Sequence, residues 1–378
     1  MKANYLLYFC DSIGSVFDSQ VLALINSISN KKYFKEVYLF LGIKDEKDKN
    51  NINSKIPPDL KTVFYKTYPN YPFFNFLIRR SIKSALQEQR LNLNEVIFHT
   101  RGELTALHLS EILDKKYHKN ILPDVRGASV EEIGEFYDSN KFLKSQKITN
   151  YIKAVKSLNH FNKISAVSIS LKQYLITNYH IASDRISITP CLAGPDFRYD
   201  ESQREYIRKE LNLKSEDSLI VFSTGGTANW QNNDMLILLA EKGFKVLNLS
   251  KKEINHKNII NRFVSYSEIP AYLNAADAAI IWRDKSIVNK VASPVKFSEY
   301  VCCGLPVIAN NTVDMISEYL TEFDCGIIID SLDSIAPVTL KNLSKKNRKM
   351  ISETGIVNFG IETVVESYFK IYSSIINL

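Results

Sequence analysis

Short apolar segments alternate with longer amphipathic segments along the whole chain. Segments that predict strands lie at residues 4–9, 36–42, 61–67, 95–99, 121–125, 163–167 and 186–189, and again at 219–223, 244–249, 278–282, 306–309 and 325–328. Amphipathic segments that predict helices lie between most of them, which is typical of parallel sheets covered by helices. The sequence therefore predicts an α/β protein in which both halves have the same alternation of strands and helices.

The alternation is interrupted once, near the middle of the chain. Pro190, Gly194 and Pro195 break the pattern before a charged segment that predicts a helix over residues 201–211. Earlier in the chain, the polar stretch 44–55 is expected to be a surface loop without structure of its own. The linker between the two halves is therefore placed at the proline-containing segment.

Chain length supports a division at this point. A single core usually stops growing near about 250–300 residues, so a chain of 378 residues is expected to form two domains. We expect a first domain at 1–190 and a second at 191–360. A C-terminal helix is expected at 361–378, and packing against the first domain is one arrangement open to it.

Composition excludes several classes of protein. Hydrophobic residues make up 45% of the chain and charged residues 24%, as in ordinary globular proteins. No apolar run approaches the roughly 20 residues that cross a bilayer, and the first apolar segment is too short, and too soon followed by Asp11, for a signal peptide. We therefore expect a cytoplasmic protein. The five cysteines form no Cys-x-x-Cys or Cys/His cluster, which predicts reduced, structural thiols.

Positive charge is concentrated in the first half. Residues 1–190 contain 27 Lys and Arg against 18 Asp and Glu, which gives a charge of +9. Since the whole chain has a net charge of +7, the second half is slightly acidic. Within the first half, residues 65–85 mix six aromatic side chains with Arg79, Arg80 and Lys83. Such a segment predicts either a helix on an anionic membrane surface or a core helix whose charges extend outward.

Two glycine-containing loops follow predicted strands, where doubly wound sheets bind ligands. After the first strand, Gly14 would allow the backbone to approach a phosphate or sugar, although a simple turn explains it as well. After residues 219–223, Gly225, Gly226 and Thr227 lie where a diphosphate could meet backbone amides. A plain strand-to-helix turn is the alternative there.

Residues 283–308 carry the densest set of candidate binding residues. They predict a loop, a short helix that begins near Pro294, a glycine stop and a strand. Ser293 and the free amides at the helix start suit a phosphate, and Lys296 adds positive charge. Glu299 could accept two hydrogen bonds from a ribose diol. One helix would then contact both halves of a nucleotide.

Polar residues also follow two predicted strands of the first half. His99 and Arg101 end one strand, Asp124 and Arg126 end the next, and Glu131 follows shortly after. These positions predict a second binding site at the carboxyl edge of the first sheet. A buried strand-end histidine and a pair of surface arginines are the alternatives.

The stretch 283–308 resembles the nucleotide-sugar site of family 4 glycosyltransferases of the GT-B fold. The shared signature is Arg, Asn, then Ser-Pro-x-Lys-Phe-x-Glu-Tyr and Cys/Gly-Gly-x-Pro-Val-Ile. The resemblance extends to residues 124–127, 190–197, 222–231 and 266–277, and so to roughly the whole chain.

This resemblance implies two Rossmann-like domains that face each other across a cleft. The second would bind a nucleoside-diphosphate sugar, and the first would bind a glycan or lipid-linked acceptor. The implied reaction is retaining transfer of the sugar to an acceptor hydroxyl, without a metal or cofactor, in surface-polysaccharide or lipid-linked glycan assembly. An anionic membrane surface is a further candidate partner, and no nucleic-acid partner is expected.

The resemblance also implies roles for single residues. Arg283, Lys290 and Lys296 are the candidates for stabilising the departing diphosphate. In the first domain, Arg101 and Arg126 would contact phosphate. His99 would line the sugar and acceptor site, while Asp124 or a nearby glutamate such as Glu131 would orient the acceptor hydroxyl.

The chain departs from the family pattern at two places. Family members commonly carry two glutamates eight residues apart, whereas Val291 stands eight residues before Glu299. Residues 224–234 also lack the Arg and Lys often found after the first strand of the second domain. Phosphate charge must then be met elsewhere, which increases the importance of Arg283 and Lys296.

Three other functions are consistent with a fold of this kind. A non-catalytic partner of a transferase would explain Val291 but would not need Lys296 and Glu299. A nucleotide-sugar epimerase would convert its donor without any acceptor. A two-domain solute-binding protein would be exported, and the sequence predicts no export signal.

Overall fold

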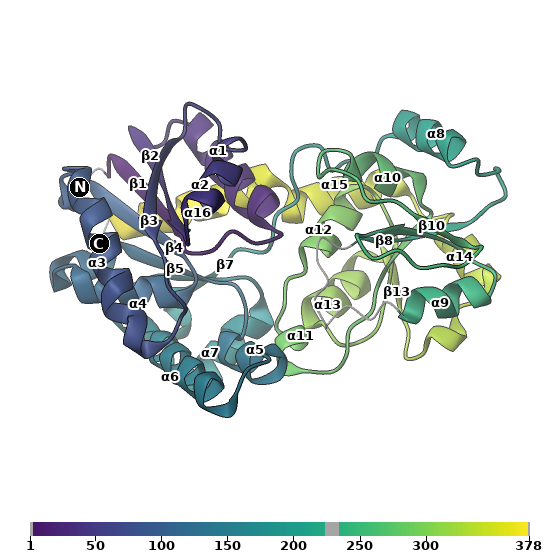
Figure 1. Cartoon of the computed structure of the whole chain (residues 1–378). Helices are drawn as coiled ribbons and strands as arrows, with labels where there is room; N and C mark the ends of the chain where they lie inside the picture. The colour runs from purple at the N-terminus through teal and green to yellow at the C-terminus, as the bar shows by residue number, and fades with distance from the viewer. Residues whose placement is uncertain (1–2, 224–233, 377–378) are drawn as a thin grey trace. The chain divides into compact units, whose positions relative to one another are not determined.

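The computed structural model of the chain describes residues 3–223 and 234–376 (Figure 1). The chain divides into two compact units. The first unit comprises Met1–Pro190 together with Val365–Leu378, and the second comprises Cys191–Val364. Each contains one parallel sheet with helices around it, so the expected α/β class is confirmed.

The first unit contains a seven-stranded sheet in the order β3-β2-β1-β4-β5-β6-β7. Its strands are β1 (Tyr5–Cys10), β2 (Glu36–Ile43), β3 (Lys61–Lys66), β4 (Val96–Arg101), β5 (Ile121–Val125), β6 (Ile164–Ala166) and β7 (Ile186–Ile188). Its α-helices are α1 (Ala23–Asn30), α2 (Glu46–Asn53), α3 (Asn75–Glu88), α4 (Glu103–Ile112), α5 (Ser129–Phe136), α6 (Lys141–Ser157) and α7 (Ile169–Tyr179), joined by α16 (Ile361–Ile376). Strand β1 and the first half of β4 are apolar, and nearly all residues of both strands are buried, because helices cover both faces of the sheet.

The second unit contains a six-stranded sheet in the order β10-β9-β8-β11-β12-β13. Its strands are β8 (Leu219–Ser223), β9 (Lys245–Leu249), β10 (Ile259–Asn261), β11 (Ala278–Ile281), β12 (Val307–Ala309) and β13 (Gly326–Ile328). Its α-helices are α8 (Glu201–Glu210), α9 (Asp234–Glu241), α10 (Ile269–Ala275), α11 (Ile287–Lys290), α12 (Val295–Cys302), α13 (Asp314–Phe323), α14 (Pro337–Leu343) and α15 (Arg348–Phe359). Strand order reverses between β8 and β11 here, and between β1 and β4 in the first unit.

The predicted strands are confirmed to within a few residues, but three other expectations need correction. Strand β10 was missed, since its two isoleucines stand between polar residues at 255–258 and 261–262. The stretch 44–55 is not a structureless loop, because the Asp45 side chain accepts a hydrogen bond from the Asp48 backbone and starts α2, which buries Ile52. Residues 65–85 are not one helix, since the segment begins in β3 and enters α3 only at Asn75.

Helix α16 is attached to the first sheet by a buried chain of polar groups. The Tyr372 hydroxyl lies 2.7 Å from Nδ1 of His99 in β4. His99 Nε2 lies 3.9 Å from the Asp124 carboxylate in β5, which accepts a hydrogen bond of 2.9 Å from Ser165. His99 and Asp124 are fully buried. The helix therefore packs beside the strands of the first unit through polar as well as apolar contacts (Figure 1).

Gly304, which ends α12, should not tolerate a side chain. Its φ of +72° is unfavourable for other residues, and a β-carbon there would collide with the carbonyl oxygen of Arg348. We expect Gly304→Ala to lower the free energy of unfolding by about 3 kcal/mol. Gly243→Ala is the control, since φ is +88° but no atom lies within 4 Å, and it should cost about 1 kcal/mol. If urea titrations showed the same loss of unfolding free energy for both variants, the packing argument would be wrong.

Candidate donor site in the second unit

The candidate donor site lies where strand order reverses between β8 and β11. In open α/β sheets, ligands bind beyond the carboxyl ends of the strands at this position. A small cavity is present there, between Phe222 of β8, Trp282 and Arg283 after β11, and Pro294 and Lys296 at the start of α12. The structure thus brings together residues that the sequence places up to 74 positions apart.

Helix α12 begins and ends as the sequence predicted. Pro294 precedes its first turn, and Gly304 follows its last. The helix spans only eight residues, and most of them are buried between the sheet and α15. The Ser352 hydroxyl of α15 donates a hydrogen bond of 2.5 Å to the carbonyl of Cys302, which fixes the two helices against each other.

Three hydroxyl groups connect α12 to its surroundings. The buried Tyr300 hydroxyl accepts a hydrogen bond of 2.8 Å from the backbone of Ser223, the last residue of β8. Ser293 accepts one of 3.0 Å from the Cys191 backbone N–H, and Ser298 donates one of 2.7 Å to the Cys191 carbonyl. Ser293, predicted to bind phosphate, therefore already has one protein partner.

Arg283 is positioned by asparagine side chains. Asn289 accepts a hydrogen bond of 3.4 Å from the Arg283 guanidinium, and its own amide donates to the Asp284 carbonyl at 2.9 Å. Asn310 holds the backbone, because its side-chain amide donates to the Arg283 carbonyl at 2.6 Å. Sequence reasoning did not assign Asn310, since its position after β12 becomes informative only when the strand order is known.

The site carries positive charge that the described residues do not neutralise. Burial lowers the pKa of Arg283 to about 10, and the Tyr300 hydroxyl opposes this only slightly. Burial and the neighbouring Arg283 lower the pKa of Lys296, while Glu299 opposes the change. In the described part of the chain, neither cation forms an ion pair within 4 Å with a carboxylate. The two groups repel each other in a partly enclosed space that would favour an anion.

Glu299 lies on the buried side of α12, with only 5% of its surface exposed. Burial raises the pKa of its carboxyl, while Lys296 and Tyr266 act in the opposite direction. A buried carboxyl is suited to accept hydrogen bonds from hydroxyl groups.

The remaining donor-site candidates are less central. Lys290 is exposed at the end of α11. Gly14 lies in the exposed loop after β1 of the first unit, and a β-carbon there would meet no atom within 4 Å. Gly225, Gly226 and Thr227 lie outside the described residues.

Candidate acceptor residues gather at the carboxyl edge of the first sheet. His99 and Asp124 are fully buried, so neither faces a ligand directly in this structure. Burial favours the neutral form of Asp124, but Arg126, which lies 3.4 Å away, outweighs it together with His99 and lowers the pKa. Arg101, the last residue of β4, and Glu131, in α5, are partly exposed.

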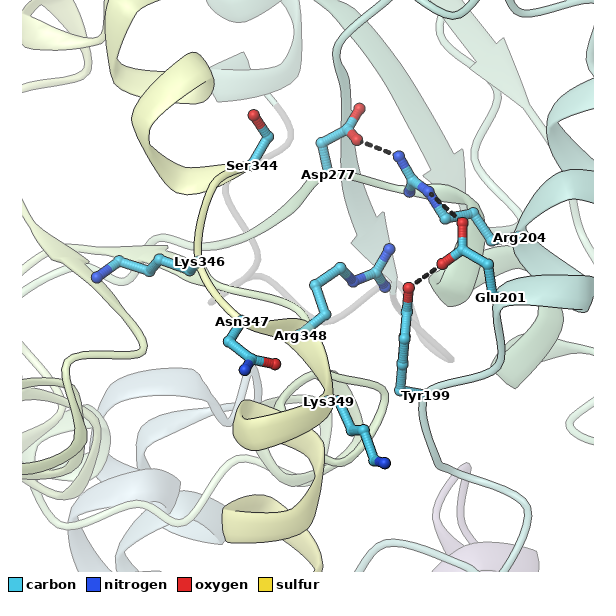
Figure 2. A pocket seen from close by; sticks show the side chains of 9 residues that line it. All are labelled: Tyr199, Glu201, Arg204, Asp277, Ser344, Lys346, Asn347, Arg348 and Lys349. Atoms are coloured by element: carbon cyan, nitrogen blue, oxygen red, sulfur yellow. Dashed lines mark hydrogen bonds and ion pairs between the residues drawn. The ribbon is translucent and has the colours of Figure 1, made fainter.

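A second cavity in this unit lies at the opposite edge of the sheet (Figure 2). Asp277, in its wall, directly precedes β11, whereas Arg283 follows that strand. Arg204 donates hydrogen bonds to the Asp277 carboxylate and to the carbonyls that end α10, and Arg348 donates to two of the same carbonyls. In Figure 2 the ammonium groups of Lys346 and Lys349 point away from Arg348. These arginines stabilise a helix end, and Lys346, which also lines the cavity, forms an ion pair with Asp324.

One family of known proteins matches part of the second unit. Residues 240–354, which include Arg283 and α12, match the model of the family described as glycosyl transferases group 1. No curated protein matches the chain at a significant level.

Solved structures share the whole fold at low sequence identity. A glycosyltransferase from Rickettsia africae is 16% identical with a TM-score of 0.68, and 99% of each chain is covered. Sucrose-phosphate synthase from Thermosynechococcus elongatus is 12% identical, with a TM-score of 0.69 and 99% of each chain covered. HepE from Anabaena, solved with UDP, is 12% identical with a TM-score of 0.68, over 99% of this chain and 100% of HepE.

These similarities confirm the expected GT-B fold, with its two Rossmann-like sheets. Residues 240–354, which contain the candidate donor site, match the group 1 glycosyl transferases, and this match supports glycosyl transfer as the activity.

Proposed function

We propose that the chain transfers a sugar from a nucleoside-diphosphate sugar to an acceptor hydroxyl, with retention of anomeric configuration. The observation that carries the donor assignment is the pair of cations Arg283 and Lys296 at the reversal point of the second sheet, neither of which forms an ion pair within 4 Å with a carboxylate of the described residues. A diphosphate would supply the missing negative charge. HepE, solved with UDP and with UDP-glucose, makes a nucleotide sugar a reasonable donor class.

The proposed chemistry is electrostatic. Negative charge grows on the diphosphate as the bond to the sugar breaks, and Arg283 and Lys296 stabilise it without a metal or cofactor. Glu299 accepts hydrogen bonds from the ribose, and Ser293 and Pro294 place the helix amides toward phosphate. Lys290, Gly14 and the loop glycines are proposed as outer donor contacts.

The acceptor is proposed to bind the first unit, where Arg101, Arg126 and Glu131 face the carboxyl edge. Asp124 and His99 act through other residues, because Asp124 holds Arg126 and His99 holds α16. We propose that the reaction belongs to the assembly of a surface polysaccharide or lipid-linked glycan. The sequence signature of residues 283–308 supports this setting.

One observation favours a second candidate, a non-catalytic partner that binds nucleotide. Val291, which replaces the first family glutamate, is 1% exposed and thus offers no polar contact to a donor sugar. A transfer assay with bound donor separates the two, because only an enzyme would release free nucleoside diphosphate in the presence of an acceptor extract.

Glu299→Ala should reduce donor affinity. The change removes charge-assisted hydrogen bonds worth roughly 1.5–3 kcal/mol, which corresponds to about a ten- to hundredfold weaker affinity for nucleoside diphosphate. Calorimetry with UDP and GDP measures this, and Glu322→Ala, at an exposed position of α13, is the control. A normally folded Glu299→Ala protein with parental affinity would show that the donor site is wrongly assigned.

Lys296→Ala should act on turnover more than on binding. Its interaction strengthens as the diphosphate gains charge, so we expect kcat to fall by about a hundredfold or more while donor affinity changes less. The control is Lys285→Ala, at an exposed position of the preceding loop. A loss confined to donor affinity would count against a role in the transition state.

We also propose that the first unit contacts an anionic membrane surface through a stripe at the start of α3. Phe73, Phe76, Arg80 and Lys83 are exposed and recur at three- to four-residue spacing, which places Phe76, Arg80 and Lys83 on one face of the helix. Ile78 and Ile82 are buried on the other face. In the described part of the chain, no helix is long and apolar enough to cross a membrane.

This arrangement separates the charges that the sequence grouped together. Arg79 forms an ion pair with Glu111 of α4 and belongs to the interior side, whereas Arg80 and Lys83 remain exposed. The stripe therefore combines aromatic side chains with two basic groups, as surfaces that insert into headgroups do.

The doubly substituted protein Phe73→Ser/Phe76→Ser should bind anionic vesicles less well. We expect the parent to sediment with vesicles containing phosphatidylglycerol at low salt and to be released as salt rises. The substitution should reduce the bound fraction severalfold, whereas Tyr206→Ser, at an exposed aromatic position of the second unit, should not. No binding of the parent at low ionic strength would exclude the membrane contact.

A further inference from the structure

The second cavity of the second unit, at the edge of the sheet opposite the donor site, has dimensions that suit a small molecule (Figure 2). Its volume is about 300 Å³, and pockets for small molecules occupy about 300–1,000 Å³. The walls come from the start of α8, from the residue before β11 and from the segment that joins α14 to α15. None of the nine lining residues is aliphatic, which argues against an apolar ligand.

The lining carries more positive than negative charge. Its cations are Arg204, Lys346, Arg348 and Lys349, and its acidic residues are Glu201 and Asp277. Lys346 pairs with Asp324, which lies outside the lining, and Asp277 is bound by two arginines of α8. In the described part of the chain, neither Arg348 nor Lys349 forms an ion pair within 4 Å with a carboxylate. The cavity therefore favours an anionic ligand.

Arg348 is held firmly at the wall of this cavity. Its guanidinium donates hydrogen bonds of 3.0 and 3.1 Å to carbonyls at the end of α10 and two of 3.2 Å to carbonyls at the end of α12. These bonds use four of its five N–H groups, and the side chain points toward Arg204 and Glu201 (Figure 2). Burial and the neighbouring Arg204 lower the pKa of Arg348 to about 10, while Asp277 acts in the opposite direction. A ligand anion would relieve this repulsion.

The remaining groups suit the hydroxyls of a ligand better than a nucleobase. The Glu201 carboxylate accepts a hydrogen bond from Tyr199, and 56% of its side chain is exposed, so it can accept further hydrogen bonds. The Asn347 side-chain oxygen accepts from the Met350 backbone at 3.1 Å, which leaves its amide nitrogen to donate. The guanidinium of Arg348 lies 4.8 Å from the centroid of the Tyr199 ring, so this face of the ring is not open to stack on a base.

Arg348 also connects the cavity to the donor site. Two of the carbonyls that it binds belong to Cys303 and Gly304, which follow the last turn of α12. Lys296 and Glu299 of the donor site lie on the same helix, which is only about 12 Å long. A ligand that binds the Arg348 guanidinium therefore acts on the support of a short helix that carries two donor-site residues.

We propose that this cavity binds a phosphorylated sugar and that the bound sugar phosphate changes donor affinity through α12. The phosphate contacts Arg348 and Lys349. The sugar hydroxyls contact Glu201 and Asn347. The Lys349 ammonium points away from Arg348 in Figure 2, but its flexible stem allows it to turn toward a phosphate. Binding at this cavity goes beyond the proposed function, whereas the effect on donor affinity rests on it.

Calorimetry on the full chain tests the ligand class. The probes are glucose 6-phosphate, mannose 6-phosphate and fructose 6-phosphate, with glucose and inorganic phosphate as the two parts of such a ligand. Saturating UDP is present, so that the donor site is occupied. The parent should bind at least one sugar phosphate about tenfold more tightly than either part. Failure of all three to bind, or equal binding of inorganic phosphate, overturns the proposal.

Variants of the lining test the location. Lys349→Glu should weaken binding of the sugar phosphate by about tenfold, because attraction to the phosphate becomes repulsion. Lys345→Glu makes the same charge change at an exposed position outside the lining and should have no effect. Arg348→Ala would also remove helix-end hydrogen bonds, so Ser344→Glu, at an exposed position of the lining, is the second variant. Parental binding by folded Lys349→Glu and Ser344→Glu proteins overturns the proposal.

UDP titrations with and without the sugar phosphate test the connection through α12. We expect the affinity of the parent for UDP to change by about fivefold or more, and the affinity for the sugar phosphate to change by the same factor when UDP is bound. An unchanged UDP affinity would show that the cavity does not act on the donor site. Absence of UDP and GDP binding, with sugar phosphate binding retained, would count against the proposed function and support the cavity alone.

Discussion

The placement of α12 is the constraint on which the donor site depends. The Tyr300 hydroxyl fixes the helix to the end of β8, the Ser352 hydroxyl fixes its last turn to α15, and Ser293 and Ser298 fix its start to Cys191. The helix could not otherwise bring Lys296 close to Arg283, since two cations in a poorly solvated space repel each other. Packing energy elsewhere in the unit therefore maintains an electrostatically unfavourable arrangement, which is what a preorganised anion site requires.

Much of this fold could be predicted from the sequence. Parallel strands buried on both faces produce continuous apolar runs, which is why segments such as residues 5–10 and 219–223 were placed to within a residue. Pro294 and Gly304 likewise gave the bounds of α12, because one suits a helix start and the other a left-handed end. Local chemistry determines these features, so a local pattern reveals them.

Features that depend on strand order were not accessible in this way. Asn310 is 27 positions from Arg283 and looks like an ordinary loop residue. Its side chain reaches the Arg283 carbonyl only because β12 pairs with β11. His99 illustrates the reverse case, since its position after a strand predicted a ligand contact, whereas the fold directs it toward Tyr372 of α16.

The division of α16 between the units affects how this protein could be recombined with its relatives. Residues 361–364 belong to the second unit, but the helix from Val365 onward belongs to the first and supplies the hydroxyl next to His99. A chimera joined only at Pro190 would thus combine the first sheet with a foreign C-terminal helix. His99 would then lie next to a helix from another protein and would lose the hydroxyl of Tyr372. Exchange of donor specificity between such enzymes therefore requires two junctions, one before Cys191 and one near Val365.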